Sequence, residues 1–229
     1  MRTLTRTEQR LDGAVLRWDT AQSPPREVTL LALYEERTIR LLVADKALAG
    51  DVLRRDPAVR DDVVALRDLG ALTGPVAGTG GIRTGPAAPA MRLLAWYREA
   101  QRRFGIRWQL LAAINFVESA FGKVRNASSA GAQGPMQFEP ATWHAYGLGG
   151  DVHDPHDAIL GAANYLAANN GARDERYAVL RYNPSGLYAD AVLRYANRIA
   201  RSPDAFLVYY SWQVYIHTRS GERRVTGPA

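Results

Sequence analysis

The segment that most constrains the fold of this chain is the run from Trp108 to Phe121, WQLLAAINFVESAF, which is apolar almost all round. A helix without a polar face normally forms the buried centre of its domain. We therefore expect a central helix over residues 107–121, with an α-helical domain packed around it.

Apolar residues recur at helical spacing along most of the remaining chain. Between residues 26 and 72 they predict a helical hairpin or small bundle, which Asp56-Pro57 interrupts. Asp154 followed by Pro155 has the form of a helix N-cap and first helical residue. Further helices are expected from Met91 to Gly105, from 155 to 171, over 174–182 and over 187–201.

Two segments depart from the helical pattern. Residues 73–90, TGPVAGTGGIRTGPAAPA, are rich in glycine and proline, which predicts a linker without regular structure. The tail, FLVYYSWQVYIHT, is dense in aromatic and β-branched residues and precedes the turn Arg219-Ser220-Gly221-Glu222, so it predicts a β-hairpin. Alternation along the strand predicts a buried face made of Tyr210, Trp212, Val214 and Ile216. The expected segments are a helical module (1–75), a linker (76–90), a main helical domain (91–202) and a hairpin tail (203–229).

Composition narrows the class of protein. With 47% hydrophobic and 23% charged residues, the 229-residue chain has the balance of a globular protein. Its formal charge of +6 suits a polyanionic partner, whether nucleic acid, an anionic membrane surface or an acidic cell-wall polymer. Because no helix-turn-helix or zinc signature is recognisable, we do not expect nucleic-acid binding.

The absence of cysteine excludes disulfides, thiolate zinc sites and a cysteine nucleophile. The N-terminal residues lack the apolar core of a secretory signal, and no stretch approaches the ~20 apolar residues of a membrane span. We expect no membrane span, and either action in the cytoplasm or export through a segment outside this sequence.

Glu118 is the first candidate for a catalytic residue. It lies near the C-terminal end of the apolar helix, between Val117 and Ala120, where a carboxylate is poorly solvated. Burial disfavours the charged form and raises the pKa, so that a carboxyl group stays protonated near neutral pH and can donate its proton. A glutamate at the edge of the core, paired with Arg125, would give the same pattern.

A loop of small residues follows, with the sequence SSAGAQGPMQ from Ser128 to Gln137. Small residues permit close approach of the backbone, so the loop could place its amides and the Ser128 and Gln137 side chains against a bulky ligand. The alternative is an ordinary turn between two helices, which would need fewer residues.

The string ESAFGKVRNASSAGAQGPMQFEPATW resembles the signature of the soluble lytic transglycosylase domain. Tyr182-Asn183 resembles the Tyr-Asn motif of that family, and DPHDAILGAANYLAANNG is similar to the segment that joins its motifs. The resemblance covers about residues 92–201, and its variants with Gly-Pro-Met-Gln-Phe occur in actinobacterial cell-wall enzymes and phage proteins. It implies a mainly α, lysozyme-like catalytic domain that cleaves peptidoglycan.

The resemblance also implies roles for individual residues. Glu118 would be the catalytic acid and then the base, with Tyr182 orienting it. Ser128 and Gln137 would contact the N-acetyl group of the substrate or the Glu118 carboxyl. Because one more residue than usual precedes Ser128, Ser129 competes for that role. Met136 and Asn183 would shape the cleft. This sequence departs from the family at Glu139, where an apolar residue is usual, and at Arg181, where a small one is usual.

The reaction implied needs a single carboxyl group. Most glycosidases use two, one to protonate the leaving oxygen and one to attack or to activate water. In the family, the N-acetyl carbonyl of muramic acid assists departure, and Glu118 would then take the C6 hydroxyl proton to give a 1,6-anhydro sugar. No metal and no cofactor are expected. Peptidoglycan lies outside the cytoplasm, so the resemblance implies export or delivery by a phage particle.

Three alternatives stay open. A goose-type lysozyme-like hydrolase could use Glu139, Asp151 or Asp154 to hold an attacking water. A catalytically idle cell-wall-binding module could grip glycan through its basic charge and aromatic tail. A metal site could form where Asp151, His153, Asp154 and His156 crowd together, although such a cluster is more often a polar loop that caps a helix.

Overall fold

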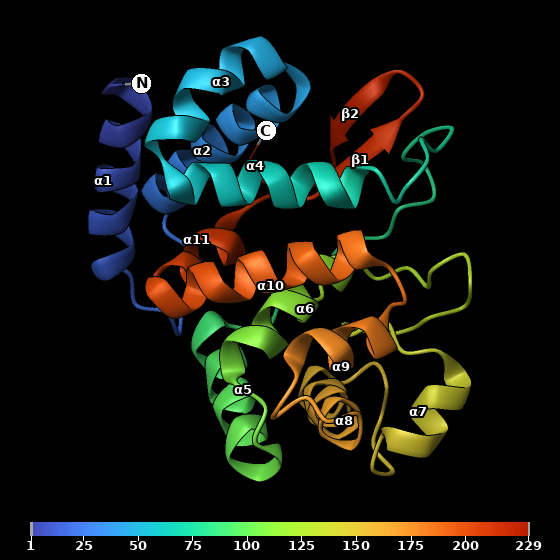
Figure 1. Ribbon diagram of the computed structural model, residues 1–229. Helices are drawn as coiled ribbons and strands as arrows, with labels where there is room; N and C mark the ends of the chain where they lie inside the picture. The colour runs from blue at the N-terminus through green and yellow to red at the C-terminus, as the bar shows by residue number, and fades with distance from the viewer. Residues whose placement is uncertain (1, 229) are drawn as a thin grey trace.

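The computed structural model describes residues 2–228, and this part of the chain is mainly helical with one short C-terminal hairpin (Figure 1). The predicted fold class is confirmed. The helices are α1 (Arg2–Leu16), α2 (Arg26–Ala44), α3 (Lys46–Arg55), α4 (Pro57–Gly70), α5 (Ala90–Phe104), α6 (Trp108–Ser119), α7 (Pro140–Tyr146), α8 (Pro155–Ala168), α9 (Glu175–Tyr182), α10 (Gly186–Arg201) and α11 (Ala205–Ser211), and the antiparallel strands are β1 (Tyr215–Thr218) and β2 (Gly221–Arg224).

Helix α6 is the central helix that its composition predicts. Its residues from Leu110 to Ile114 are fully buried, and it packs against α5, α8, α10 and α11. The helices around it begin and end where the sequence indicates. Asp56 and Asp154 cap α4 and α8 through their side chains, and Gly105 ends α5 with a φ of 72°.

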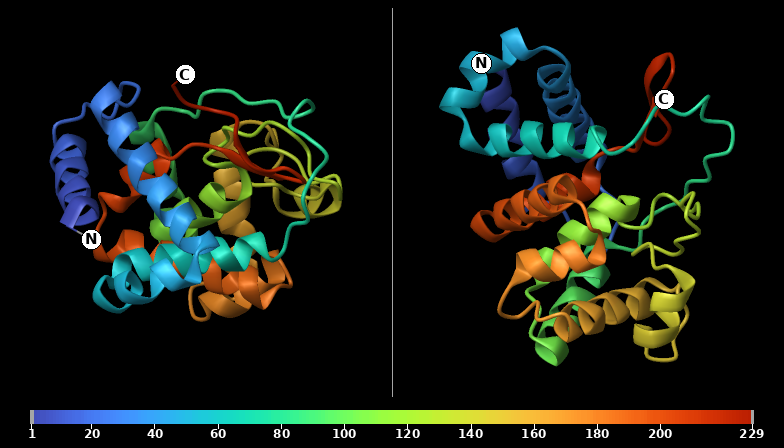
Figure 2. Two further views of the ribbon diagram at one scale, coloured as in Figure 1. Left: turned by 90° about the horizontal axis from the view of Figure 1, so that it is seen from above. Right: turned by 45° about the vertical axis from the view of Figure 1, so that its right-hand side comes forward.

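Helix α10 lies between two groups of helices. It packs on α4 on one side and on α6 on the other, and Figures 1 and 2 show α1–α4 and α5–α9 on opposite sides of it. Buried apolar side chains from both groups form one continuous core. Helix α1, which lies within the helical module predicted for residues 1–75, packs on α2. The segment boundaries at 75, 90 and 202 stay predictions.

The segment between α4 and α5 contains no helix and no strand of a sheet among its described residues, as its glycine and proline content predicts. Single β-bridges attach it to the rest of the molecule, from Val76 to Thr218 and from Thr84 to Val124. No helix among the described residues is long and apolar enough to cross a membrane.

The predicted strand conformation of the tail is wrong for its first half. Residues 205–211 form α11, and only residues 215–224 form the hairpin. Tyr209, Tyr210 and Trp212 are all buried, so the alternation of inward and outward side chains is wrong as well. A helix brings positions 206, 209 and 210 to one face, where their rings pack in edge-on, stacked or tilted arrangements against Phe116 and Phe121.

Candidate functional site

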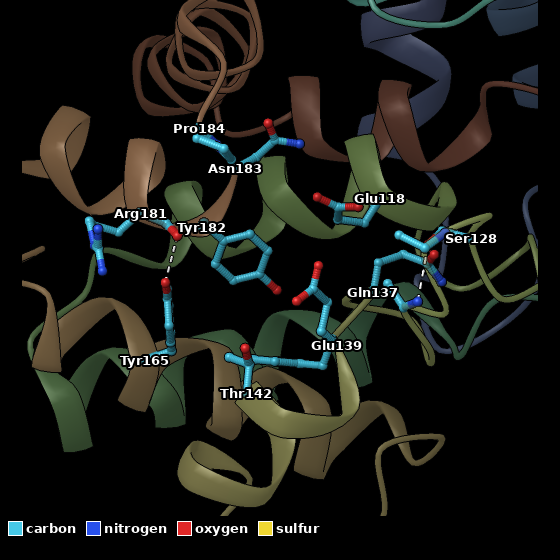
Figure 3. A pocket seen from close by; sticks show the side chains of 13 residues that line it. Glu118, Ser128, Gln137, Glu139, Thr142, Tyr165, Arg181, Tyr182, Asn183 and Pro184 are labelled. Carbon is cyan, nitrogen blue, oxygen red and sulfur yellow. Dashed lines mark hydrogen bonds between the residues drawn. The ribbon is translucent and has the colours of Figure 1, made fainter.

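Glu118 lies in the last turn of α6 and points into a cavity (Figure 3). The hydroxyl of Tyr188, at the start of α10, donates a hydrogen bond to Glu118 Oε1. Burial raises the pKa of Glu118 to about 7, although the bond from Tyr188 lowers it. At neutral pH the carboxyl group is therefore divided between its protonated and ionised forms, as an acid that also serves as a base requires.

The cavity has a volume of about 380 Å³ and opens beside Glu118. Figure 3 shows the carboxyl groups of Glu118 and Glu139 facing each other across it, with the ring of Tyr182 beside them. Polar side chains dominate its wall. The lining residues are Glu118, Ser128, Ala130, Ala132, Gln137, Phe138, Glu139, Thr142, Tyr165, Arg181, Tyr182, Asn183 and Pro184.

A buried network of hydrogen bonds fixes the end of α6 to the loop that follows. Ser119 Oγ donates to the Pro135 carbonyl at 2.5 Å and accepts from the Gly122 amide at 2.8 Å. Asn115 Nδ2 donates to the same carbonyl at 2.7 Å, and Tyr97 donates to Asn115 Oδ1 at 2.6 Å. This network was not predicted from the sequence, although two polar residues four positions apart on an apolar helix, Asn115 and Ser119, were a signal for it.

The small-residue loop makes the close approach that its composition predicts. Gly134 has a φ of 73°, and a Cβ there would lie 1.8 Å from the Val152 carbonyl oxygen. Gln137, with a φ of 50°, donates from Nε2 to the carbonyls of Gly134 at 2.9 Å and Asn126 at 3.2 Å. Backbone contacts on both sides therefore fix the position of this loop.

The structure brings four of the six predicted binding residues to the cavity with Glu118, namely Ser128, Gln137, Tyr182 and Asn183. Ser128 Oγ also accepts from the amides of Ala130 at 3.2 Å and Ala132 at 3.0 Å, which shapes the loop.

Two of the predicted binding residues do not line the cavity. Ser129 is exposed and lies outside the lining. Met136 is fully buried, because its side chain packs in the core beneath the loop. The side chain of Met136 therefore does not line the cavity. The expectation that Met136 shapes the cleft stays a prediction, and its backbone carbonyl contributes a contact.

That carbonyl accepts a hydrogen bond of 2.6 Å from the Tyr182 hydroxyl. The bond to the Glu118 carboxyl group comes from Tyr188 instead. The expectation that Tyr182 orients Glu118 stays a prediction. Burial raises the pKa of both tyrosines well above the ordinary value, so both are neutral donors. No feature of the sequence distinguished Tyr188 from the other tyrosines nearby.

The three acidic residues considered for holding an attacking water lie in different places. Glu139 is exposed and lines the cavity. Asp151 and Asp154 do not line it. Asp154 Oδ1 accepts from the amides that begin α8, and Asp151 Oδ1 accepts from the His153 amide at 2.8 Å. Neither carboxylate is placed to hold a water at Glu118.

Asp154, His156 and Asp157 form the one group among the described residues with metal-ligand atoms close together, all within 4.8 Å. The group differs from the one that the sequence suggested, because Asp151 and His153 are not part of it. Asp154 acts as the cap of α8 within this group, and His156 Nε2 contacts Glu99 at 3.0 Å. This arrangement agrees with a polar helix cap.

Comparison with protein families matches residues 96–197 to the family described as Transglycosylase SLT domain. The match contains Glu118, Tyr188 and every residue that lines the cavity. It confirms the resemblance drawn from the motifs. No curated protein and no solved structure matches the chain.

Proposed function

Because residues 96–197 match the family described as Transglycosylase SLT domain, we propose that the protein is a lytic transglycosylase of peptidoglycan. Its reaction would cleave the β-1,4 bond between N-acetylmuramic acid and N-acetylglucosamine and leave 1,6-anhydro ends. The observation that carries the proposal is the position of Glu118. Its carboxyl group faces a polar cavity, has a pKa of about 7 and is held by Tyr188.

The first step is the departure of the leaving sugar. Protonated Glu118 gives its proton to the glycosidic oxygen, and the bond from that oxygen to C1 breaks. The N-acetyl carbonyl of the muramoyl unit attacks C1 from the opposite face, so no second carboxylate is needed. The hydrogen bond from Tyr188 holds the carboxyl group in place during the transfer.

The second step closes the anhydro ring. Glu118, now ionised, accepts the proton of the C6 hydroxyl, and O6 bonds to C1 as the N-acetyl carbonyl leaves. Glu118 ends protonated, and no water is consumed. One carboxyl group with a pKa near neutrality can perform both transfers, because it is neither a strong acid nor a strong base.

A lysozyme-like hydrolase is the second candidate, and the position of Glu139 favours it. Its carboxylate lines the cavity opposite Glu118, where it could activate a water. Glu139 is exposed, so water competes for it, and we place it second for that reason.

Peptidoglycan as substrate places the action of the protein outside the cytoplasm. Export from the cell, or delivery by a phage particle, would bring it there. The proposed reaction uses neither a metal nor a cofactor.

Digestion of purified sacculi by the wild type and by Glu118→Gln, followed by mass spectrometry of the released muropeptides, tests the proposal. We expect products that lack the elements of one water, and a loss of rate in the variant of about 10²-fold or more. Glu139→Gln is the matched control and should retain the anhydro product. Hydrated products that disappear in Glu139→Gln would establish the hydrolase instead, and full activity of Glu118→Gln would contradict both.

A further inference from the structure

Helix α5 carries an outer face of arginines. Its four arginines and one glutamate give these 15 residues a formal charge of +3, which is half of the charge of +6 on the whole chain. The buried residues of α5 recur three and four positions apart, so one side of the helix packs on α6 and α8. The arginines lie on the other side and are all exposed. We call them the basic face of α5, and they are Arg92, Arg98, Arg102 and Arg103.

The charge of this face is not balanced within the protein. Among residues 2–228, none of the four guanidinium groups has a hydrogen-bond or ion-pair partner. Arg103 alone makes a contact of another kind, with its guanidinium carbon 5.1 Å from the centre of the Phe104 ring. Glu99 is the one acidic residue of α5, and its carboxylate contacts His156 Nε2 at 3.0 Å. The arginines are therefore free to bind an external anion.

Helix stability does not account for the basic face. Arg102 and Arg103 lie in the last turn, where the helix dipole favours a cation. Arg92 lies in the first turn, where the same dipole disfavours one. Arg98 and Arg102 are four residues apart, and like charges at this spacing repel each other. The arrangement therefore costs stability in the free protein, and a bound anion would offset this cost.

The basic face lies away from the catalytic cavity and from the pocket beside it. This second pocket, of about 520 Å³, forms between the end of α4, the hairpin and the end of α6, and it shares Glu118 and Asn183 with the first. Among the described residues that line the two pockets, none belongs to α5. Figure 1 shows α5 and α7 on opposite sides of α8, and α7 contributes Thr142 to the first cavity. A ligand on the basic face therefore leaves Glu118 open to substrate.

The side chains of the face suit an extended polymer of phosphates. The arginines are spread over roughly 15 Å of helix, and the planar guanidinium group matches the oxygens of a phosphate. A helix that binds a membrane surface needs apolar side chains beside its cations, whereas Met91 is the one large apolar residue exposed on α5. Single-stranded nucleic acid is held by exposed aromatic rings, but Tyr97 is buried and Trp96 packs on the ring of His156.

We propose that the basic face of α5 binds an anionic phosphodiester polymer of the cell wall and so holds the enzyme on its substrate. The inference rests on the proposed function, which places the protein at the wall. A polymer with repeated phosphates offers an anion to each arginine in turn. Contacts of this kind are electrostatic and independent of sequence, so the enzyme can move along the polymer while it remains bound.

The first test measures binding of soluble poly(glycerol phosphate) over a range of salt concentrations. The triple variant Arg92→Gln, Arg98→Gln, Arg102→Gln should bind about 100-fold more weakly than the wild type at low salt. The slope of the logarithm of the binding constant against the logarithm of the salt concentration should become shallower by about two, because three phosphate contacts are lost.

A second triple variant, with the same change of charge on α2 and the hairpin, is the matched control. It carries Arg37→Gln, Arg219→Gln and Arg223→Gln, at three exposed arginines that line neither pocket. The control should bind the polymer within about threefold of the wild type, since screening limits charges far from the contact. Equal weakening of the two triple variants would show attraction by net charge alone and would overturn the inference.

The second test uses sacculi that carry phosphodiester polymers and sacculi from which cold hydrofluoric acid has removed them. The wild type should digest the first faster than the α5 triple variant does, and both should digest the stripped sacculi at equal rates, which also shows that the variant is folded. Equal rates of the two proteins on both kinds of sacculi would overturn the inference, as would tighter binding to vesicles of anionic phospholipid than to poly(glycerol phosphate). Absence of anhydro products with intact binding of the polymer would contradict the proposed function alone.

Discussion

Replacement of Tyr188 by phenylalanine should raise the pKa of Glu118. The Tyr188 hydroxyl donates to Glu118 Oε1, and it stabilises the carboxylate more than the neutral acid. A hydrogen bond to a charged group contributes roughly 1.5–3 kcal/mol, and one pKa unit corresponds to about 1.4 kcal/mol. Loss of the bond in Tyr188→Phe should therefore move the pKa from about 7 to about 8 or 9.

The assay is the dependence of kcat/KM on pH for the cleavage of glycan strands, which reports the pKa of the acid in the free enzyme. A general acid must be protonated, so the rate of the wild type should fall above pH of about 7. In Tyr188→Phe this fall should move to higher pH by one to two units, to a pH of about 8 or 9. The maximal rate should also decrease, because the carboxyl group loses a positioning contact.

Tyr182→Phe is the matched control. Tyr182 is another buried tyrosine of the site, but its hydroxyl donates to the Met136 carbonyl and not to Glu118. This variant should change the rate and leave the pH of the fall in place. An unchanged fall in Tyr188→Phe, or a fall at lower pH, would refute the argument that Tyr188 stabilises the ionised form of Glu118.

Two further predictions concern stability. Gly134→Ala should lower the free energy of unfolding by more than about 1 kcal/mol, because its Cβ would lie 1.8 Å from the Val152 carbonyl, a contact that adds to the strain of a positive φ. Gly131→Ala is the control, because Gly131 has a φ of 85° and an added Cβ there would meet nothing within 4 Å, so this variant measures the strain of the positive φ alone. The two variants are compared by denaturant unfolding, and an equal loss of unfolding free energy in both would contradict the clash. Glu35 is buried, and burial raises its pKa from 4.5 to about 8, so the folded state holds a proton that the unfolded state releases over this range. The stability of the wild type should therefore fall as the pH rises from 4.5 to about 8, and Glu35→Gln should flatten this dependence in thermal unfolding at a series of pH values; an unchanged slope would contradict it.

Local patterns in the sequence were sufficient to predict the central helix, most helix boundaries and the burial of Glu118. The reason is that each depends on near neighbours. An all-round apolar run must be buried, Asp154 satisfies the amides of the two residues at the start of its own helix, and Gly105 permits the left-handed turn that ends α5. The burial of Glu118, and with it the direction of its pKa, followed from the residues beside it.

The tertiary structure decided everything that depends on residues far apart in the chain. Tyr188 reaches Glu118 across 70 residues, and nothing local marks it as the partner in preference to Tyr182. The tail forms α11 because packing of its rings on Phe116 and Phe121 outweighs the strand preference of β-branched and aromatic residues. The second pocket exists only because α4 and the hairpin, which no motif connects, are folded against the end of α6. Sequence periodicity fixes which face of an element is buried, but the energy of packing between elements determines which neighbour that face meets.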